Sequence, residues 1–311
     1  MFKSLSILFF IIIINIIAIY FILFTKYVPD FYVFIQYAFK DSARILDISS
    51  LISNVLLFDL FVKIGDYLSF DDFTQWIYLW LGVTVFTLSL KYYILFNSGR
   101  IYKVFIVYFA SFFVDLNQLR FNFAFVLLVI AIFYRKFWFS KFFIILSSIS
   151  HVMPILFYSI AKLRKINMKY IISIFSILLV IILLVDYSLI VNSRLFDYVK
   201  IGNGSQLPKV LILFFPSLFY VVSSTFKSEL FYIAKSFIFT ILMIGVIIFP
   251  FNFEVSARLF EFSFIVVSIT NVYYHYSYKF DFILFFLSVA VILSRITNGI
   301  NTASDFIEFY Q

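Results

Sequence analysis

The sequence predicts an all-α polytopic integral membrane protein, with about nine to eleven transmembrane helices in a single transmembrane domain covering residues 1–311. Hydrophobic residues make up 64% of the chain and charged residues 13%, against about 45–50% and about 25% in soluble domains. The apolar residues also fall in successive runs. The length of these runs is close to the roughly 20 residues that a helix needs to cross a bilayer. Lipid is therefore the expected solvent for most of the chain.

The composition also excludes several kinds of site. The chain has no cysteine, which excludes disulfides, thiolate nucleophiles and cysteine-ligated metals. Its two histidines, His151 and His275, are too few for a histidine-rich metal site. The net charge of +8 is typical of a membrane protein whose cytoplasmic loops are rich in lysine and arginine. We therefore expect no cofactor, no metal and no nucleic-acid partner.

The first apolar run, residues 5–24, is too long for the apolar core of a signal peptide, and we interpret it as a retained span. Residues 25–75 form one long extracytoplasmic loop, since four basic residues and seven acids give it a charge of −3 in a chain of +8. Within this loop, residues 45–64 are apolar but interrupted by polar side chains. They favour an interfacial or re-entrant helix over a span.

The following spans are oriented by their basic ends, because lysine and arginine concentrate on the cytoplasmic side. Residues 76–96 run inward to Lys91, Arg100 and Lys103. Residues 101–114 run outward to Asp115, and residues 121–134 return to a second basic cluster.

Residues 142–161 lie between two basic clusters and contain serines, His151 and Pro154 near their centre. A single crossing would place one of these clusters outside. We therefore favour a re-entrant hairpin with His151 near its tip, since broken backbone is tolerated where it lines a cavity or is buried in protein. The alternative is a single span with one basic loop outside.

With that hairpin, the amino terminus is inside and the carboxyl terminus outside. The remaining expected spans are residues 170–190, 210–225, 231–249, 259–274 and 282–296, which makes nine spans plus the hairpin.

Residues 115–122, Asp-Leu-Asn-Gln-Leu-Arg-Phe-Asn, are the richest short polar segment and lie between two apolar runs. Ionisable groups near membrane depth are a functional hypothesis by default. Asp115 and Arg120 are close enough to pair across a tight outer turn. The alternative is a structural one, in which they form a loop salt bridge and an aspartate cap.

This segment, followed by a span, a basic turn and Ile-Leu-Ser-Ser-Ile-Ser-His ending at His151, resembles the core of the EpsG/Wzy-type bacterial polysaccharide polymerases. The stretch Asp30-Phe-Tyr32 resembles that family's aspartate-plus-tyrosine segment. Arg258 resembles its late arginine at the membrane edge. The likeness covers most of the chain but is sharp only over residues 110–155.

The resemblance implies a membrane glycosyltransferase that transfers glycan from undecaprenyl diphosphate to the terminal sugar of another lipid-linked repeat. Such a site needs fixed cations for the diphosphate, whose charge grows in the transition state, and arginine binds phosphate oxygens in a bidentate way. Arg120, Arg258 and Arg194 are the candidates at the outer face. His151, Asp115 and Glu254 are the candidates to orient or deprotonate the acceptor hydroxyl.

Each candidate also has a structural interpretation. His151 beside serines is equally typical of an interhelical hydrogen bond. Glu254, Arg258 and Glu261 have the spacing of a self-neutralising group on one helix face. His275, among tyrosines, indicates an interfacial aromatic belt. The outer-loop tyrosines, which could stack on sugars or belong to that belt, are Tyr27, Tyr32 and Tyr37.

The expected localisation is the bacterial cytoplasmic membrane, with the site facing the periplasm or the cell exterior. The expected partners are undecaprenyl-diphosphate-linked oligosaccharide, membrane lipid, a chain-length regulator and a flippase. The alternative functions are a lipid-linked oligosaccharide flippase or other transporter, an O-antigen-ligase-like glycosyltransferase, and a membrane acyltransferase.

Overall fold

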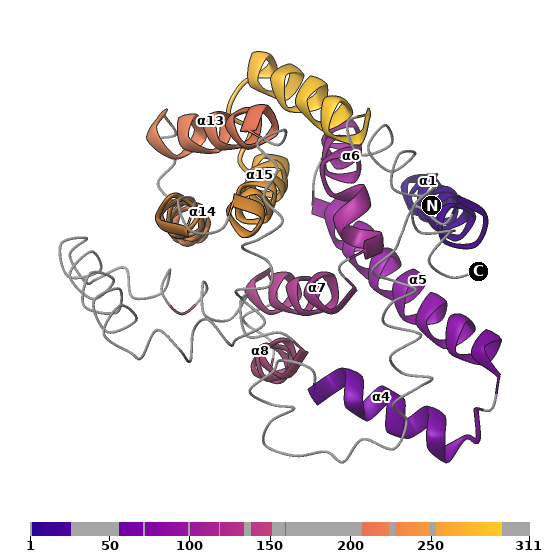
Figure 1. Cartoon of the computed structure of the whole chain (residues 1–311). Coiled ribbons are helices and arrows are strands. Elements are labelled where there is room, and N and C mark those ends of the chain that lie inside the picture. The colour runs from indigo at the N-terminus through magenta and orange to yellow at the C-terminus, as the bar shows by residue number, and fades with distance from the viewer. Residues whose placement is uncertain are drawn as a thin grey trace, which may run out of the picture. The chain divides into compact units, whose positions relative to one another are not determined.

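The computed structural model describes residues 2–25, 56–70, 72–98, 100–117, 119–133, 138–150, 159, 207–223, 228–248 and 253–293. These residues are helical with short connections, and no strand occurs among them. The all-α prediction is confirmed for this part of the chain. The helices fall into two compact units, one with residues up to 156 and from 277, the other with residues 157–276 (Figure 1).

Three helices in the described ranges are long and apolar enough to cross a membrane. Their apolar parts are Leu5–Leu23, Thr74–Asn97 and Phe231–Ile248. Shorter apolar helices cover Ile101–Phe112, Asn122–Ala131 and Ile212–Ser223. These lengths and compositions support a membrane protein.

The first unit begins with α1 (Phe2–Tyr20), which continues into a π-helical turn, η1 (Phe21–Thr25). The helices that follow are α4 (Leu56–Tyr67), α5 (Phe73–Ser98), α6 (Ile101–Asn117), α7 (Leu119–Phe133) and α8 (Phe139–Ser150). A last helix covers residues 278–293.

The exposed face of α1 is lined with large apolar side chains, as expected of a helix that faces lipid. Its other face packs on α5 and α6. Asn15 donates to Ser89 Oγ of α5 at 2.8 Å, and the ring of Phe10 meets Phe105 of α6 edge to face. The exposed apolar residues of α1 are Leu5, Leu8, Phe9, Ile12, Ile16 and Tyr20.

The core of this unit forms where α5, α7 and α8 meet. Ile94, Val126 and Ile130 are buried there, with Phe143 of α8 against them. Small residues let α7 and α8 approach closely, and Ser147 Oγ donates to the Ala124 carbonyl across the interface at 2.7 Å. Helix α8 therefore lies firmly against α7.

Helix α4 lies within the predicted outer loop and contacts α8 (Figure 1). It ends where Ser69 adopts a left-handed backbone, with φ of 56°. Gly65 of α4 lies against the buried ring of Trp76, since a Cβ on this glycine would be 2.3 Å from Trp76 Cη2. Because only glycine avoids this overlap, Gly65 sets how closely α4 approaches the start of α5.

The described helices of the second unit are α13 (Leu207–Ser223), α14 (Glu229–Ile248) and α15 (Phe253–Tyr273). Helix α15 is the central element, and almost every side chain from Ser256 to Val272 is buried. Ser263 donates to Ser217 Oγ of α13 at 3.0 Å, and Ser256 donates to the Gly245 carbonyl of α14 at 2.7 Å. Hydroxyl groups thus tie the three helices together.

The predicted hairpin over residues 142–161 is described only in its first part, within α8. Its tip at His151 and most of the second arm lie outside the described residues, as do the spans expected at 170–190 and the loop around Arg194.

Candidate functional site

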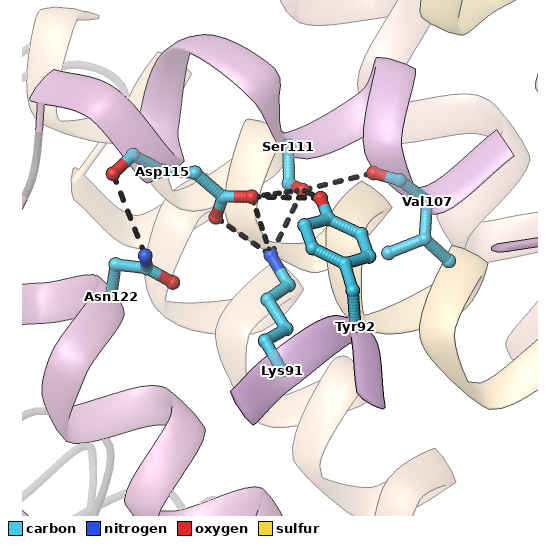
Figure 2. Close-up of polar contacts among 6 residues, drawn as sticks. All are labelled: Lys91, Tyr92, Val107, Ser111, Asp115 and Asn122. Atoms are coloured by element: carbon cyan, nitrogen blue, oxygen red, sulfur yellow. Dashed lines mark hydrogen bonds and ion pairs between the residues drawn. The ribbon is translucent and has the colours of Figure 1, made fainter. Parts of the chain in front are cut away.

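A buried polar cluster forms around Asp115, where α5 and α6 meet (Figure 2). Lys91 Nζ lies 2.6 Å from Asp115 Oδ1 and 2.8 Å from Oδ2, and 2.9 Å from Ser111 Oγ. The Tyr92 hydroxyl donates to Asp115 Oδ2 at 3.0 Å. The four side chains are almost fully buried, with Lys91 at 4% and Asp115 at 2% exposure. We call these four residues, Lys91, Tyr92, Ser111 and Asp115, the Asp115 cluster.

The hydrogen-bond donors and acceptors of the Asp115 cluster match. Lys91 has three N–H donors, which reach both carboxylate oxygens and Ser111 Oγ. Ser111 has one proton and two acceptors within reach, the Val107 carbonyl at 2.9 Å and Asp115 Oδ2 at 2.8 Å. Both carboxylate oxygens of Asp115 therefore have charged or hydroxyl donors, as a buried charge requires.

The local sequence produces this arrangement directly. Ser111 and Asp115 are four residues apart on α6 and so share one face of the helix. Lys91 and Tyr92 are consecutive on α5, and the Tyr92 ring packs edge to face on Tyr108, 5.7 Å between centroids. The long lysine stem spans the distance from its own helix to the carboxylate.

Asp115 is also held through its main chain. Asn122 Nδ2 lies 3.5 Å from the Asp115 carbonyl oxygen (Figure 2). The first turn of α7 is thus tied to the last turn of α6 through the Asn122 side chain.

Arg120, the expected partner of Asp115, is the second residue of α7. The side chain of Arg120 is outside the described residues, so its pairing with Asp115 stays a prediction. The structure instead shows Lys91 as the partner of the Asp115 carboxylate.

A second polar cluster joins the start of α6 to the start of helix 278–293. Lys103 Nζ lies 3.7 Å from Asp281 Oδ1, and Tyr102 donates to Asp281 Oδ2 at 3.0 Å. Arg100 donates to the Tyr278 hydroxyl at 2.6 Å, which raises the pKa of the exposed guanidinium above its ordinary value. These contacts fix the ends of the two helices to each other.

By the positive-inside rule, Lys91 and Lys103 mark the inner end of the span predicted at 76–96. In the structure both are buried in ion pairs, with 4% and 2% exposure, because Asp115 and Asp281 neutralise them. The sequence signal for Lys91 was its isolation in an apolar run, which marks an ionisable residue inside a span. The sequence alone does not identify its partner, Asp115, because that residue lies on another helix.

The acidic and basic group predicted on one face of α15 is only partly described. Arg258 is exposed and Glu261, at 2% exposure, is buried. Glu254 belongs to the first turn of α15, but its side chain is outside the described residues. Arg258 and Glu261 therefore differ in exposure, and the position of the Glu254 side chain stays a prediction.

The remaining predicted site residues are not brought together by the described part of the chain. His151, Arg194, Tyr27, Tyr32 and Tyr37 lie outside it. His275 lies in the short segment after α15 and is half-buried among tyrosines. Among the residues that the structure does describe, no three His, Cys, Asp or Glu side chains are grouped to hold a metal ion.

No protein-family profile, curated protein or solved structure matches this chain. The functional assignment therefore depends on the chemistry of the residues and on the resemblance given above.

Proposed function

We propose that this protein is a polymerase of lipid-linked oligosaccharide repeat units at the outer face of the bacterial cytoplasmic membrane. The observation that carries the proposal is the order of residues where α6 ends and α7 begins. A buried aspartate, Asp115, lies in the last turn of α6, and Arg120 lies in the first turn of α7. The segment that resembles the EpsG/Wzy-type polymerases has its aspartate and arginine at these two positions.

The start of a helix suits the binding of a diphosphate. Main-chain N–H groups there have no partner within the helix, and the helix dipole favours a negative charge. An arginine in the same turn adds a charged, bidentate donor. We propose Arg120 as a ligand that neutralises the diphosphate of the lipid donor. Arg258 and Arg194, in the other unit, are separate candidates for the same role.

The proposed reaction is a glycosyl transfer. The acceptor hydroxyl oxygen bonds to the anomeric carbon while the bond from that carbon to the diphosphate oxygen breaks. The hydroxyl proton passes to a base, and the polyprenyl diphosphate leaves with the bonding electron pair. Negative charge grows on the leaving group, so the arginines stabilise the transition state more than the bound donor.

The contacts of Asp115 favour a positioning role over a role as that base. Its carboxylate oxygens already accept from Lys91 and Tyr92 in a buried site. A base needs a free lone pair directed at its substrate. His151 and Glu254 are therefore the residues we propose as the base.

The membrane topology belongs to the same proposal. It has nine spans, a re-entrant hairpin at 142–161 and an extracytoplasmic loop at 25–75, with the amino terminus inside. This orientation puts the start of α7 on the outer side, and it predicts the same side for Arg194 and for Arg258.

Replacing the proposed diphosphate ligands tests the function. Arg120→Ala and Arg258→Ala should leave the protein in the membrane yet stop chain lengthening, so that single repeats accumulate on the lipid carrier at the outer face. The measurement is the length distribution of the lipid-linked glycan on a gel. Loss of one such cation should lower the rate by about a hundredfold or more.

Arg100→Ala is the matched control, since Arg100 is an exposed arginine bonded to Tyr278 and lies on the inner side in the proposed topology. It should give glycan of parental length. Full-length glycan in both Arg120→Ala and Arg258→Ala would contradict the proposal. Single repeats retained at the inner face would instead indicate a flippase.

A further inference from the structure

Lys91 is a buried cation that the residues resembling the polymerase family do not include. Its side chain is 4% exposed, and its ammonium is held by both oxygens of Asp115 and by Ser111. Burying two charges costs several kcal/mol per ion before their attraction offsets it, and apolar side chains of similar volume often stabilise a core as well or better. Stability alone therefore gives little reason for this pair.

The location of the pair suggests another reason. Asp115 is four residues before the start of α7 and five before Arg120. Lys91 fastens its side chain to α5, and Asn122 of α7 fastens its carbonyl (Figure 2). Helices α5, α6 and α7 thus meet at Asp115, close to the first turn of α7, which contains the proposed diphosphate ligand Arg120.

We infer that Lys91 is a positioning residue, which holds the last turn of α6 and, through it, the first turn of α7, so that Arg120 meets the diphosphate of the lipid donor. This inference depends on the proposed function. Lys91 touches no substrate in it and acts through Asp115. Misplacement of a catalytic group by about 1 Å can lower a rate by about a hundredfold.

The double variant Lys91→Met/Asp115→Asn removes both charges but keeps an acceptor for Tyr92, so no unpaired buried charge remains to unfold the protein. Lys63→Met is the matched control. It breaks the pair between Lys63 and Asp66, 3.9 Å apart and with side chains 38% and 31% exposed.

Two properties of each variant are measured. The first is the kcat/KM for a lipid-diphosphate-linked repeat in proteoliposomes. The second is the mobility of a nitroxide spin label. Because the chain has no cysteine, Leu119→Cys gives a unique attachment site at the first residue of α7. A separate label at Val222→Cys, on an exposed position of α13, reports on general loosening.

In the double variant we expect a more mobile label at residue 119, an unchanged spectrum at residue 222, and a kcat/KM lowered by about ten- to a hundredfold. Lys63→Met should leave all three readouts at parental values. A parental spectrum at residue 119 or a parental kcat/KM in the double variant would overturn the inference. Equal loosening at both labels would also overturn it, since that is the signature of a purely structural pair.

The activity of Arg120→Ala distinguishes a failure of this inference from a failure of the proposed function. If Arg120→Ala is inactive and the double variant has parental kcat/KM, the inference about Lys91 fails and the proposed function stands. If Arg120→Ala has parental kcat/KM, the proposed role of Arg120 fails, and the positioning of Arg120 by Lys91 fails with it.

Discussion

At the scale of single residues, the pairing of Lys91 with Asp115 explains how two charges can lie inside an apolar helix bundle. Each carboxylate oxygen receives a lysine donor, and Tyr92 adds a further hydrogen bond. Such a pair need not stabilise the fold on balance, but removing one partner leaves the other buried without compensation.

We therefore predict that the losses in the free energy of unfolding caused by the two single substitutions do not add up in the double variant. Lys91→Met and Asp115→Leu should each lower the free energy of unfolding by about 3–5 kcal/mol, whereas the double variant Lys91→Met/Asp115→Leu should be close to the parent. Unfolding in mixed detergent micelles, followed by tryptophan fluorescence, measures the three values.

The exposed pair of Lys63 and Asp66 is the control for this cycle. Its side chains are 38% and 31% exposed, so Lys63→Met, Asp66→Leu and their double variant should each change the free energy by no more than about 1 kcal/mol. A Lys91 and Asp115 double variant that loses the sum of its two single losses would refute the argument.

At the scale of elements, helix ends are defined by local capping. Helix α5 starts after Asp72, whose Oδ1 accepts from the Thr74 N–H at 3.0 Å, while the Asp72 N–H donates to Gln75 Oε1 at 3.4 Å. Each side chain satisfies a main-chain group that the first turn leaves open. The hydrogen bond from the Thr74 main chain lowers the pKa of Asp72 below its ordinary 3.8.

The lowered pKa predicts a pH-dependent cap. A carboxyl group whose pKa is lower in the folded state stabilises that state above its unfolded pKa, and this stabilisation is lost as the pH falls through the folded pKa. The parent should therefore lose melting temperature below about pH 4 relative to Asp72→Asn, which caps without titrating.

Melting curves between pH 3 and pH 7 check the prediction for the parent, Asp72→Asn and Asp72→Ala. Asp72→Ala should be less stable than the parent near neutral pH. An identical pH profile for the parent and Asp72→Asn would show that the cap of α5 does not depend on the charge of Asp72.

At the scale of the whole molecule, the orientation of every later span depends on the proposed hairpin at 142–161, and reporter fusions test it. A reporter fused after Lys165 should be cytoplasmic and one fused after Ser205 external, because the hairpin returns the basic cluster at 162–169 to the inside. The measurement is the activity of reporters that work on one side of the membrane only.

A fusion after Lys136 is the control, since that residue is cytoplasmic both with a hairpin and with a single span. External activity after Lys165 would establish a single crossing at 142–161. It would also invert every later span, moving Arg258 to the inner side and removing it from the proposed site.

The helical spans were predictable from the sequence because each is a run of apolar residues that can satisfy its main chain only internally. The run at 76–96 matches α5 (Phe73–Ser98), and the run at 231–249 matches α14 (Glu229–Ile248). The boundary between α6 and α7 was also predictable, since polar residues interrupt two apolar runs there. The number of spans and the single domain over 1–311 remain predictions.

What only the tertiary structure decided is which side chains meet. The sequence indicated Asp115 as notable but suggested Arg120, five residues away, as its partner. The structure shows Lys91 from the preceding helix at 2.6 Å. Lys103 likewise meets Asp281, far along the chain. Apolar runs act on their own through hydration and main-chain bonding, whereas a buried charge is stable only beside an opposite charge that packing brings to it, and no local pattern encodes that meeting.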